Sequence, residues 1–162
     1  MNDFNAQVIA DFKQHGGKPG GYFKNAPVLL LHSIGAKSGQ ERLQPLMYLR
    51  QDADGPWHIF ASYGGAPKNP AWFHNLVAHP DVEIEIGDGT TIERVPVRAR
   101  VVEGEERSAI YAEQARRFPQ FAGYEQKTTR EIIPVVELTR RCSVLAGPAH
   151  FAHGCHLNQM ID

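Results

Sequence analysis

The sequence predicts an α+β fold that is mainly β: a small barrel of six or seven short, mostly antiparallel strands with a few covering helices. Two observations lead to this prediction. Short apolar or alternating runs recur along the chain with turn residues between them, as is typical of antiparallel strands. Segments with helical spacing are few and do not alternate regularly with the strands, which argues against a doubly wound sheet.

The size and charge of the chain fit one domain that folds alone. Its 162 residues are 42% apolar and 22% charged, close to the globular average. The net charge of −1 excludes a general attraction to nucleic acid or anionic membranes. No apolar run approaches the ~18 residues of a membrane span, and the N-terminus lacks the order of a signal peptide. We therefore expect no nucleic-acid partner, no integral membrane segment and a cytoplasmic location.

The end of the chain differs in character from the rest. Both cysteines, Cys142 and Cys155, lie there, so they cannot form a disulfide framework for the preceding residues, which fits a reducing compartment. The spacing of cysteine and histidine over residues 142–156 matches no standard zinc pattern, and we predict no metal site. The sequence thus predicts one cofactor-binding domain over residues 1–141 and a disordered or loosely attached tail over residues 142–162.

The first third of the chain predicts a helix, a connector and two strands. Phe4, Val8, Ile9 and Phe12 share one face of a helix that starts at Asn2 or Asp3 and covers one end of the core. A glycine-rich connector, residues 15–21, follows. The continuous apolar run at residues 28–33 predicts a strand buried on both faces. Residues 43–50 form the return strand, which Pro45 restricts to an edge, an end or a bulge.

The remainder predicts four strands and two helices. Strands are expected at residues 57–61, 81–86, 92–102 and 132–138, with helices after the first and third of these. In the third strand the inward set is Val95, Val97, Ala99 and Val101. The helix after it starts at the acidic residues 103–107 and ends before Pro119. Residues 118–124 form an aromatic corner that either packs in the core or walls one side of a flat ligand.

Residues 61–76 join the strand at 57–61 to the helix that follows it. Gly64 and Gly65 let the backbone approach a ligand closely, because glycine has no Cβ and accepts positive φ. Asn69 as N-cap and Pro70 at the first helical position would leave free N–H groups that favour an anion. The alternative is a purely structural turn before a well-capped helix.

Residues 35–42 form a second polar loop between two predicted strands. Its two glycines, together with Lys37 and Arg42, are the parts from which a phosphate or carboxylate site is built. The glycine spacing does not fit a Walker loop. A solvated hairpin loop is the alternative interpretation.

Six motifs in order give the chain a specific resemblance. They are residues 35–39 (GAKSG), 45–49 (PLMYL), 61–65 (ASYGG), 69–76 (NPAWFHNL), 118–124 (FPQFAGY) and 129–136 (TREIIPVV). Together they resemble the deazaflavin (F420)-dependent nitroreductase family of split β-barrel flavin and deazaflavin oxidoreductases, over roughly residues 12–139. The resemblance implies a split barrel of about six antiparallel strands that binds coenzyme F420. It also implies hydride transfer from reduced F420 to a quinone, nitroaromatic or other electron-poor organic acceptor.

The resemblance also implies roles for individual residues. The loop from Lys37 to Arg42 would meet the phosphate and oligoglutamate tail of the cofactor, and residues 45–76 its ring and ribityl chain. Phe121 and Tyr124 would lie on the substrate side. The implied cofactor-binding residues are Lys37, Ser38, Gly39, Arg42, Pro45, Met47, Ala61, Ser62, Tyr63, Gly64, Trp72, Asn75 and Leu76.

The chain departs from the family at four of these motif positions. Ala36 and Tyr63 stand where the family commonly has Arg and Lys, and Phe118 and Phe121 stand where it often has Tyr. The resemblance therefore implies fewer cationic contacts to the cofactor and fewer hydroxyl donors near the substrate.

Two residues are candidates for catalysis. Ser62 would donate a hydrogen bond to the ring edge or to the developing oxyanion of a quinone, and Tyr124 is a second candidate donor. His74, among apolar neighbours, is interpreted as a structural histidine.

Several assignments stay open at this level. A flavin mononucleotide oxidoreductase with the same barrel, or a non-catalytic flavin or haem binding protein, would use the same cations. We expect a small-molecule substrate and a monomer or homodimer. A lipid quinone as substrate would place the protein at the membrane periphery.

Overall fold

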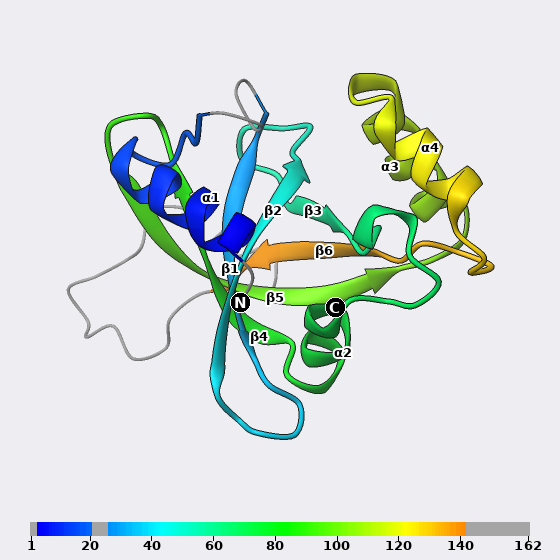
Figure 1. Ribbon diagram of the computed structural model, residues 1–162, viewed down its shortest axis with the longest axis horizontal. Coiled ribbons are helices and arrows are strands. Elements are labelled where there is room, and N and C mark those ends of the chain that lie inside the picture. Colours follow the sequence, from blue (N-terminus) through cyan, green and yellow to red (C-terminus); the bar gives the residue numbers. More distant parts are fainter. Residues whose placement is uncertain (1–2, 21–25, 142–162) are drawn as a thin grey trace.

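Six antiparallel strands close into a barrel in the order β1-β2-β3-β6-β5-β4 (Figure 1). This computed structural model describes residues 3–20 and 26–141. It confirms the predicted barrel with covering helices. The strands are β1 (Val28–Ile34), β2 (Glu41–Leu49), β3 (Trp57–Phe60), β4 (Asp81–Gly87), β5 (Ile92–Val102) and β6 (Val135–Arg140).

Helices cover the barrel in three places (Figure 1). α1 packs against β2, α2 against β1 and β5, and α3 and α4 pack on each other beside β6. A short 3₁₀ helix, η2, contacts α4. No helix in the described part of the chain is long and apolar enough to cross a membrane. The helices are α1 (Asp3–Gln14), η2 (Tyr63–Gly65), α2 (Ala71–Ala78), α3 (Gly104–Arg117) and α4 (Gln120–Lys127).

Strand β2 is not paired with its neighbour β3 over most of its length. Its residues 41–47 pair with β1, whereas only Tyr48 and Leu49 pair with β3. Pro45 therefore lies in a stretch with one paired side, which agrees with the expectation of a local edge, because proline cannot donate to a second ladder. The divergence of the two strands leaves space beside β2.

The core consists of three clusters of buried side chains. The barrel interior is filled by residues such as Leu29, Leu31, Trp57 and Ile59, together with Trp72 from α2. Tyr111 and Phe121 belong to a second cluster, beneath α3 and α4. A third cluster joins α1 to β1 through Phe12 and Leu30. The strand β1 is buried on both faces, as predicted, because α1 covers its outer side.

Four local predictions need correction. Val101 was expected inside the barrel but is 37% exposed, while Val102 is buried under α3, because β5 passes beyond the filled interior at this end. Phe4 is also exposed, although Val8, Ile9 and Phe12 are buried as expected. The last strand begins at Val135, and Ile132 before it is exposed.

The fourth correction concerns the start of α2. The N-cap is Pro70, and Asn69 does not cap the helix because its Oδ1 accepts a hydrogen bond from Arg130 instead. Helix α4, which runs through the aromatic corner, was not predicted. The predicted tail, residues 142–162 with its cysteine and histidine residues, lies outside the described residues.

Candidate functional site

Two neighbouring hollows lie beside β2 and are lined in common by Asn5, Gln44, Ala71 and Trp72. One has a volume of 570 Å³ and the other of 780 Å³. We call the first the aromatic hollow and the second the basic hollow. Because they share four lining residues, the two hollows adjoin each other, and we call them together the groove.

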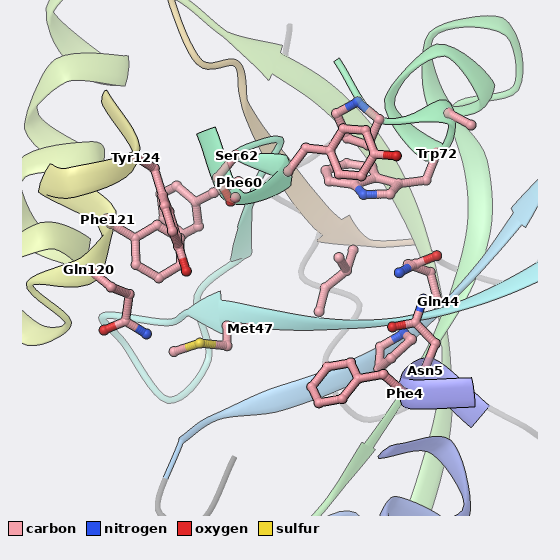
Figure 2. Close-up of a pocket in the computed structure, with 16 residues that line it drawn as sticks. Phe4, Asn5, Gln44, Met47, Phe60, Ser62, Trp72, Gln120, Phe121 and Tyr124 are labelled. Carbon is pink, nitrogen blue, oxygen red and sulfur yellow. The ribbon is translucent and has the colours of Figure 1, made fainter. Parts of the chain in front are cut away.

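The aromatic hollow lies between two sets of side chains from opposite sides of the barrel. Figure 2 shows Gln120, Phe121 and Tyr124 of α4 on one side and Phe4 and Asn5 of α1 on the other. Flat side chains on several walls suit a flat conjugated ring. Its full lining is Phe4, Asn5, Gln44, Pro45, Leu46, Met47, Phe60, Ser62, Tyr63, Gly64, Pro70, Ala71, Trp72, Gln120, Phe121 and Tyr124.

The loop at one wall of this hollow has an unusual backbone. Tyr63, Gly64 and Gly65 all have positive φ, at 48°, 61° and 83°. A Cβ on Gly65 would lie 3.1 Å from the carbonyl oxygen of Tyr124, so glycine allows the loop to pack closely on α4. Tyr63, which is not a glycine, pays a conformational cost in this region, and its side chain is exposed.

Arg130 holds this loop in place. Its Nη1 donates to the carbonyl oxygen of Ala61 at 2.8 Å, and its Nη2 donates to that of Ser62 at 2.7 Å. The same guanidinium also bonds the side chain of Asn69 at the start of α2. One planar fork therefore fixes both ends of the segment between β3 and α2.

The side chain of Ser62 has no hydrogen-bond partner among the described residues. Its carbonyl oxygen accepts from Arg130 and from the N–H of Gly65. Its Oγ and its backbone N–H make no hydrogen bond within the described residues, and Ser62 lines the aromatic hollow. Both groups are therefore available to a ligand, as the proposed donor role requires.

Helix α4 both packs in the core and lines the hollow. Tyr111 donates its hydroxyl to the carbonyl oxygen of Phe121 at 2.6 Å, and burial raises the pKa of Tyr111 well above its ordinary value. Phe121 stacks edge-on against Phe60 and Tyr124, with ring centroids 5.5 Å and 5.2 Å away. The core-packing interpretation of the aromatic corner is thus confirmed, and Phe121 and Tyr124 also line the hollow; contact with a flat ligand stays a prediction.

The basic hollow is built around the turn after β1. The Gly39 N–H donates to the Gly35 carbonyl at 2.9 Å, which closes the turn. The N–H of Ala36 donates to Oδ1 of Asn75 at 3.0 Å, which ties the turn to α2. The hollow is lined by Asn5, Ser33, Gly35, Ala36, Lys37, Ser38, Glu41, Arg42, Leu43, Gln44, Ala71, Trp72, His74 and Asn75.

The cations of this hollow are available to an anion. Lys37 and Arg42 are exposed, and neither has a carboxylate partner among residues 3–20 and 26–141. Glu41 is the one acidic lining residue, and its carboxylate is bonded to Nδ1 of the buried His32 at 2.8 Å. This bond lowers the pKa of Glu41. Because Glu41 is bonded to His32 and not to Lys37 or Arg42, both cations can form ion pairs with an anionic ligand.

Most residues implied by the resemblance line the groove. Lys37, Ser38, Arg42 and Asn75 line the basic hollow, Trp72 lines both hollows, and the other lining members of the set line the aromatic hollow. The latter are Pro45, Met47, Ser62, Tyr63, Gly64, Phe121 and Tyr124.

Three of the cofactor-binding residues implied by the resemblance do not line the groove, and His74 is not where we expected it. Ala61 and Leu76 line neither hollow because both are buried in the barrel interior. Gly39 is exposed at the tip of its turn. His74 is exposed and contacts the ring of Phe73, so it is not a buried structural histidine.

The sequence alone did not single out several groove residues. They include Phe4 and Asn5 of α1 as well as Gln44, Phe60 and Gln120. Phe4 shares the apolar face of α1 with the buried Val8, so the sequence placed it toward the core and not in the groove. Arg130 lies within a quoted motif, and its function becomes visible only with the fold.

The chain is similar to known proteins over most of its length. The family model described as F420H(2)-dependent quinone reductase matches residues 6–140. The chain belongs to this family. The F420H(2)-dependent quinone reductase of Mycobacterium tuberculosis strain H37Rv is 43% identical over 122 residues, which cover 71% of this chain and 74% of that protein.

Two solved structures share the fold of this F420H(2)-dependent quinone reductase family member. The F420-H2 dependent reductase FDR-A has a TM-score of 0.59 and 38% sequence identity, covering 69% of this chain and 93% of its own. A structure described as a domain-swapped dimer has a TM-score of 0.58 and 38% identity, covering 69% and 79%. Family membership confirms the predicted enzyme class and the predicted cofactor, F420.

Proposed function

We propose that this protein transfers a hydride from reduced F420 to a quinone, a nitroaromatic or another electron-poor organic acceptor. The observation that carries the proposal is that an aromatic hollow and a basic hollow adjoin each other and share Trp72 as a lining residue. The family's quinone reductases supply the acceptor class.

The two halves divide the binding work. The aromatic hollow would hold the deazaflavin ring and the acceptor between α4 and α1, while Lys37 and Arg42 in the basic hollow would meet the phosphate. Bound F420 supplies the hydride donor. Flat stacking against the ring, with water excluded by Phe121, Phe4 and Met47, positions the acceptor for transfer over roughly 3–3.5 Å.

Ser62 is the proposed hydrogen-bond donor in the reaction. Ser62 lines the aromatic hollow, and its hydroxyl and backbone N–H are unbonded within the described residues. They would stabilise negative charge that develops on the acceptor oxygen. Tyr124 lines the same hollow from α4 and is the second proposed donor.

Binding and turnover test the proposal together. The purified protein is titrated with F420 and with flavin mononucleotide by fluorescence, and oxidation of reduced F420 is then followed with a soluble quinone. We expect saturable F420 binding and quinone-dependent oxidation. The double variant Lys37→Ala, Arg42→Ala should weaken F420 binding about 10- to 100-fold, more strongly at low salt.

A matched pair of charge deletions serves as the control. Lys13 of α1 and Arg117 of α3 are exposed cations that line neither hollow. Replacing both with alanine removes the same total charge and should leave F420 affinity unchanged. Wild-type protein that binds F420 without consuming reduced F420 in the presence of any acceptor would instead support a carrier function.

Location and assembly complete the proposal. We place the reaction in the cytoplasm, at the membrane periphery if the acceptor is a lipid quinone. The resemblance to a domain-swapped dimer supports a homodimer. The proposed catalytic domain comprises residues 1–141, which include the matched range 6–140, and residues 142–162 form the proposed tail.

A further inference from the structure

Ser33 is a polar residue at a position where the strand pattern calls for an apolar one. It lies on the same face of β1 as Leu29 and Leu31, which are buried in the barrel interior. It is itself 0% exposed. At such a position a hydroxyl is costly unless it is hydrogen-bonded.

The hydroxyl of Ser33 has no such bond within the described part of the chain. Its Oγ is buried and has no hydrogen-bond partner there. Among the described residues, the hydroxyl therefore forms no bond that would offset the cost of its burial. A buried hydroxyl of this kind points to a bound ligand as its partner.

The surroundings of Ser33 indicate what that partner is. Ser33 lines the basic hollow and is the β1 residue directly opposite Arg42 in the strand pairing. Lys37 and Ser38 line the same hollow, and the amide oxygen of Asn75 is already occupied by the N–H of Ala36. Glu41, the acidic lining residue, is bonded through Oε1 to His32, so the cations Lys37 and Arg42 and the Ser38 hydroxyl are the groups here suited to phosphate oxygens.

We infer that Ser33 is a phosphate-binding residue, whose Oγ–H donates to a phosphate oxygen of the bound cofactor beside Lys37 and Arg42. The inference rests on the proposed function for the identity of the cofactor. It assigns the buried hydroxyl to the phosphate and not to the ring or the ribityl chain.

The test first compares F420 with a ligand that lacks its phosphate and the tail attached through it; flavin mononucleotide and riboflavin, which differ by the phosphate alone, form the second pair. Wild type and Ser33→Ala are titrated by fluorescence with F420 and with its phosphate-free deazaflavin riboflavin analogue. In the variant, Kd for F420 should rise about 10- to 100-fold, as for loss of a hydrogen bond to a charged group, and Kd for the phosphate-free analogue should not change. The melting temperature without ligand should be equal or higher, because an unpaired buried hydroxyl has been removed.

Ser108→Ala is the matched control. Ser108 is exposed on α3 and lines neither hollow, so the same substitution there should alter neither Kd nor melting temperature. Equal F420 affinity in wild type and Ser33→Ala would overturn the inference. Equal weakening of both ligands would also overturn it, because the hydroxyl would then contact the phosphate-free part. A lower melting temperature with unchanged affinity would reveal a structural role instead.

Flavin mononucleotide and riboflavin form a second pair that separates this inference from the proposed function. If the wild type bound flavin mononucleotide but not F420, the proposed function would fail. The effect of Ser33→Ala on flavin mononucleotide against riboflavin would still decide whether Ser33 binds phosphate. Wild-type protein that bound neither phosphorylated ligand would refute both.

Discussion

Ser62 uses its backbone for structure and leaves its side chain for chemistry. The carbonyl oxygen is fixed by Arg130 and by the Gly65 N–H, while Oγ is unbonded within the described residues. Ser62→Ala should therefore lower kcat with a quinone about 10- to 1,000-fold, as for removal of an oxyanion donor, and change the Kd for F420 by less than about threefold. Steady-state rates and a fluorescence titration measure the two effects. Equal losses in both would contradict a catalytic role.

Arg130 acts through the shape of its guanidinium. Lysine keeps the charge but cannot bridge the carbonyl oxygens of Ala61 and Ser62, so Arg130→Lys should free the loop from residue 61 to 69. We expect a loss of about 1–3 kcal/mol in unfolding free energy and about tenfold weaker F420 binding. Urea unfolding and titration provide the readouts. Arg116→Lys, at an exposed pair with Glu113 on α3, should change neither; a similar loss there would point to a general effect of the substitution.

At the scale of elements, the connector after α1 is held by backbone contact with the turn between β4 and β5. The N–H of Gly89 donates to the Gly16 carbonyl at 3.0 Å, and a Cβ on Gly87 would lie 2.1 Å from that same oxygen. The connector is therefore part of the packed structure and positions α1, whose first turn lines the groove.

This contact predicts a strong effect of a single methyl group. Gly87→Ala should destabilise the fold by about 2 kcal/mol or more, because backbone atoms must separate. Gly123→Ala in α4, where an added Cβ meets nothing within 4 Å, should be neutral or stabilising by up to about 1 kcal/mol. Thermal and urea unfolding of the pair measure the difference. If Gly87→Ala and Gly123→Ala had similar unfolding free energies, the backbone of the connector could move away from Gly87 at little cost.

Helices and strands were predictable where apolar residues repeat with the spacing of a helix or a strand. The strands β1, β4 and β5 and the helix α3 followed from apolar runs, alternation and acidic starts, to within a residue or two. Helix α4 was missed because it is short, contains Gly123 and follows directly on Pro119, so no period is established. Val101 was misplaced because the alternation continues while the barrel interior does not.

The site was predictable only where a motif marked it. The polar loop at residues 35–42 and the glycine-containing loop at residues 61–65 were visible in the sequence, and most of their residues line the groove. The function of Arg130 was not visible, because its hydrogen bonds span 68 and 69 residues of chain. The role of Ser33 was not visible either. A single small polar residue at the end of an apolar run is also typical of an ordinary strand end, so nothing in the sequence singled it out.

At the scale of the whole molecule, His58 makes stability depend on pH. Its side chain is buried, Nδ1 has no hydrogen-bond partner within the described residues, and Nε2 has only a long contact of 3.4 Å with the Glu137 carboxylate. Arg100 and Glu106 also act on it through their charges. Burial lowers its pKa below the ordinary 6.5, although Glu137 opposes the shift. The unfolded chain therefore binds a proton at about 6.5 that the folded protein does not yet bind.

The sign follows from that difference. Above about pH 6.5, His58 is neutral in both the folded and the unfolded protein and does not change the free energy of unfolding. Below this pH the unfolded chain gains a proton first, and the free energy of unfolding falls by up to about 1.4 kcal/mol per pH unit until His58 of the folded protein is also protonated. His58→Gln should flatten this part of the stability profile between pH 6.5 and 5, measured by urea unfolding. His79→Gln, at an exposed histidine, should leave the slope unchanged; an equally flattened profile would assign the dependence to other groups.

The separation of β2 from β3 has a consequence for the life of the protein in the cell. The groove lies where the barrel wall has only two residue pairs between these strands, so the empty protein has a seam that opens more easily than the rest. The cofactor, bound along β2 as proposed, would contact both sides of this seam and favour the closed form by mass action. Proteases cut transiently opened chains in proportion to how often they open. Cells short of the cofactor should therefore degrade this reductase faster, and its abundance should follow the supply of the molecule that it uses.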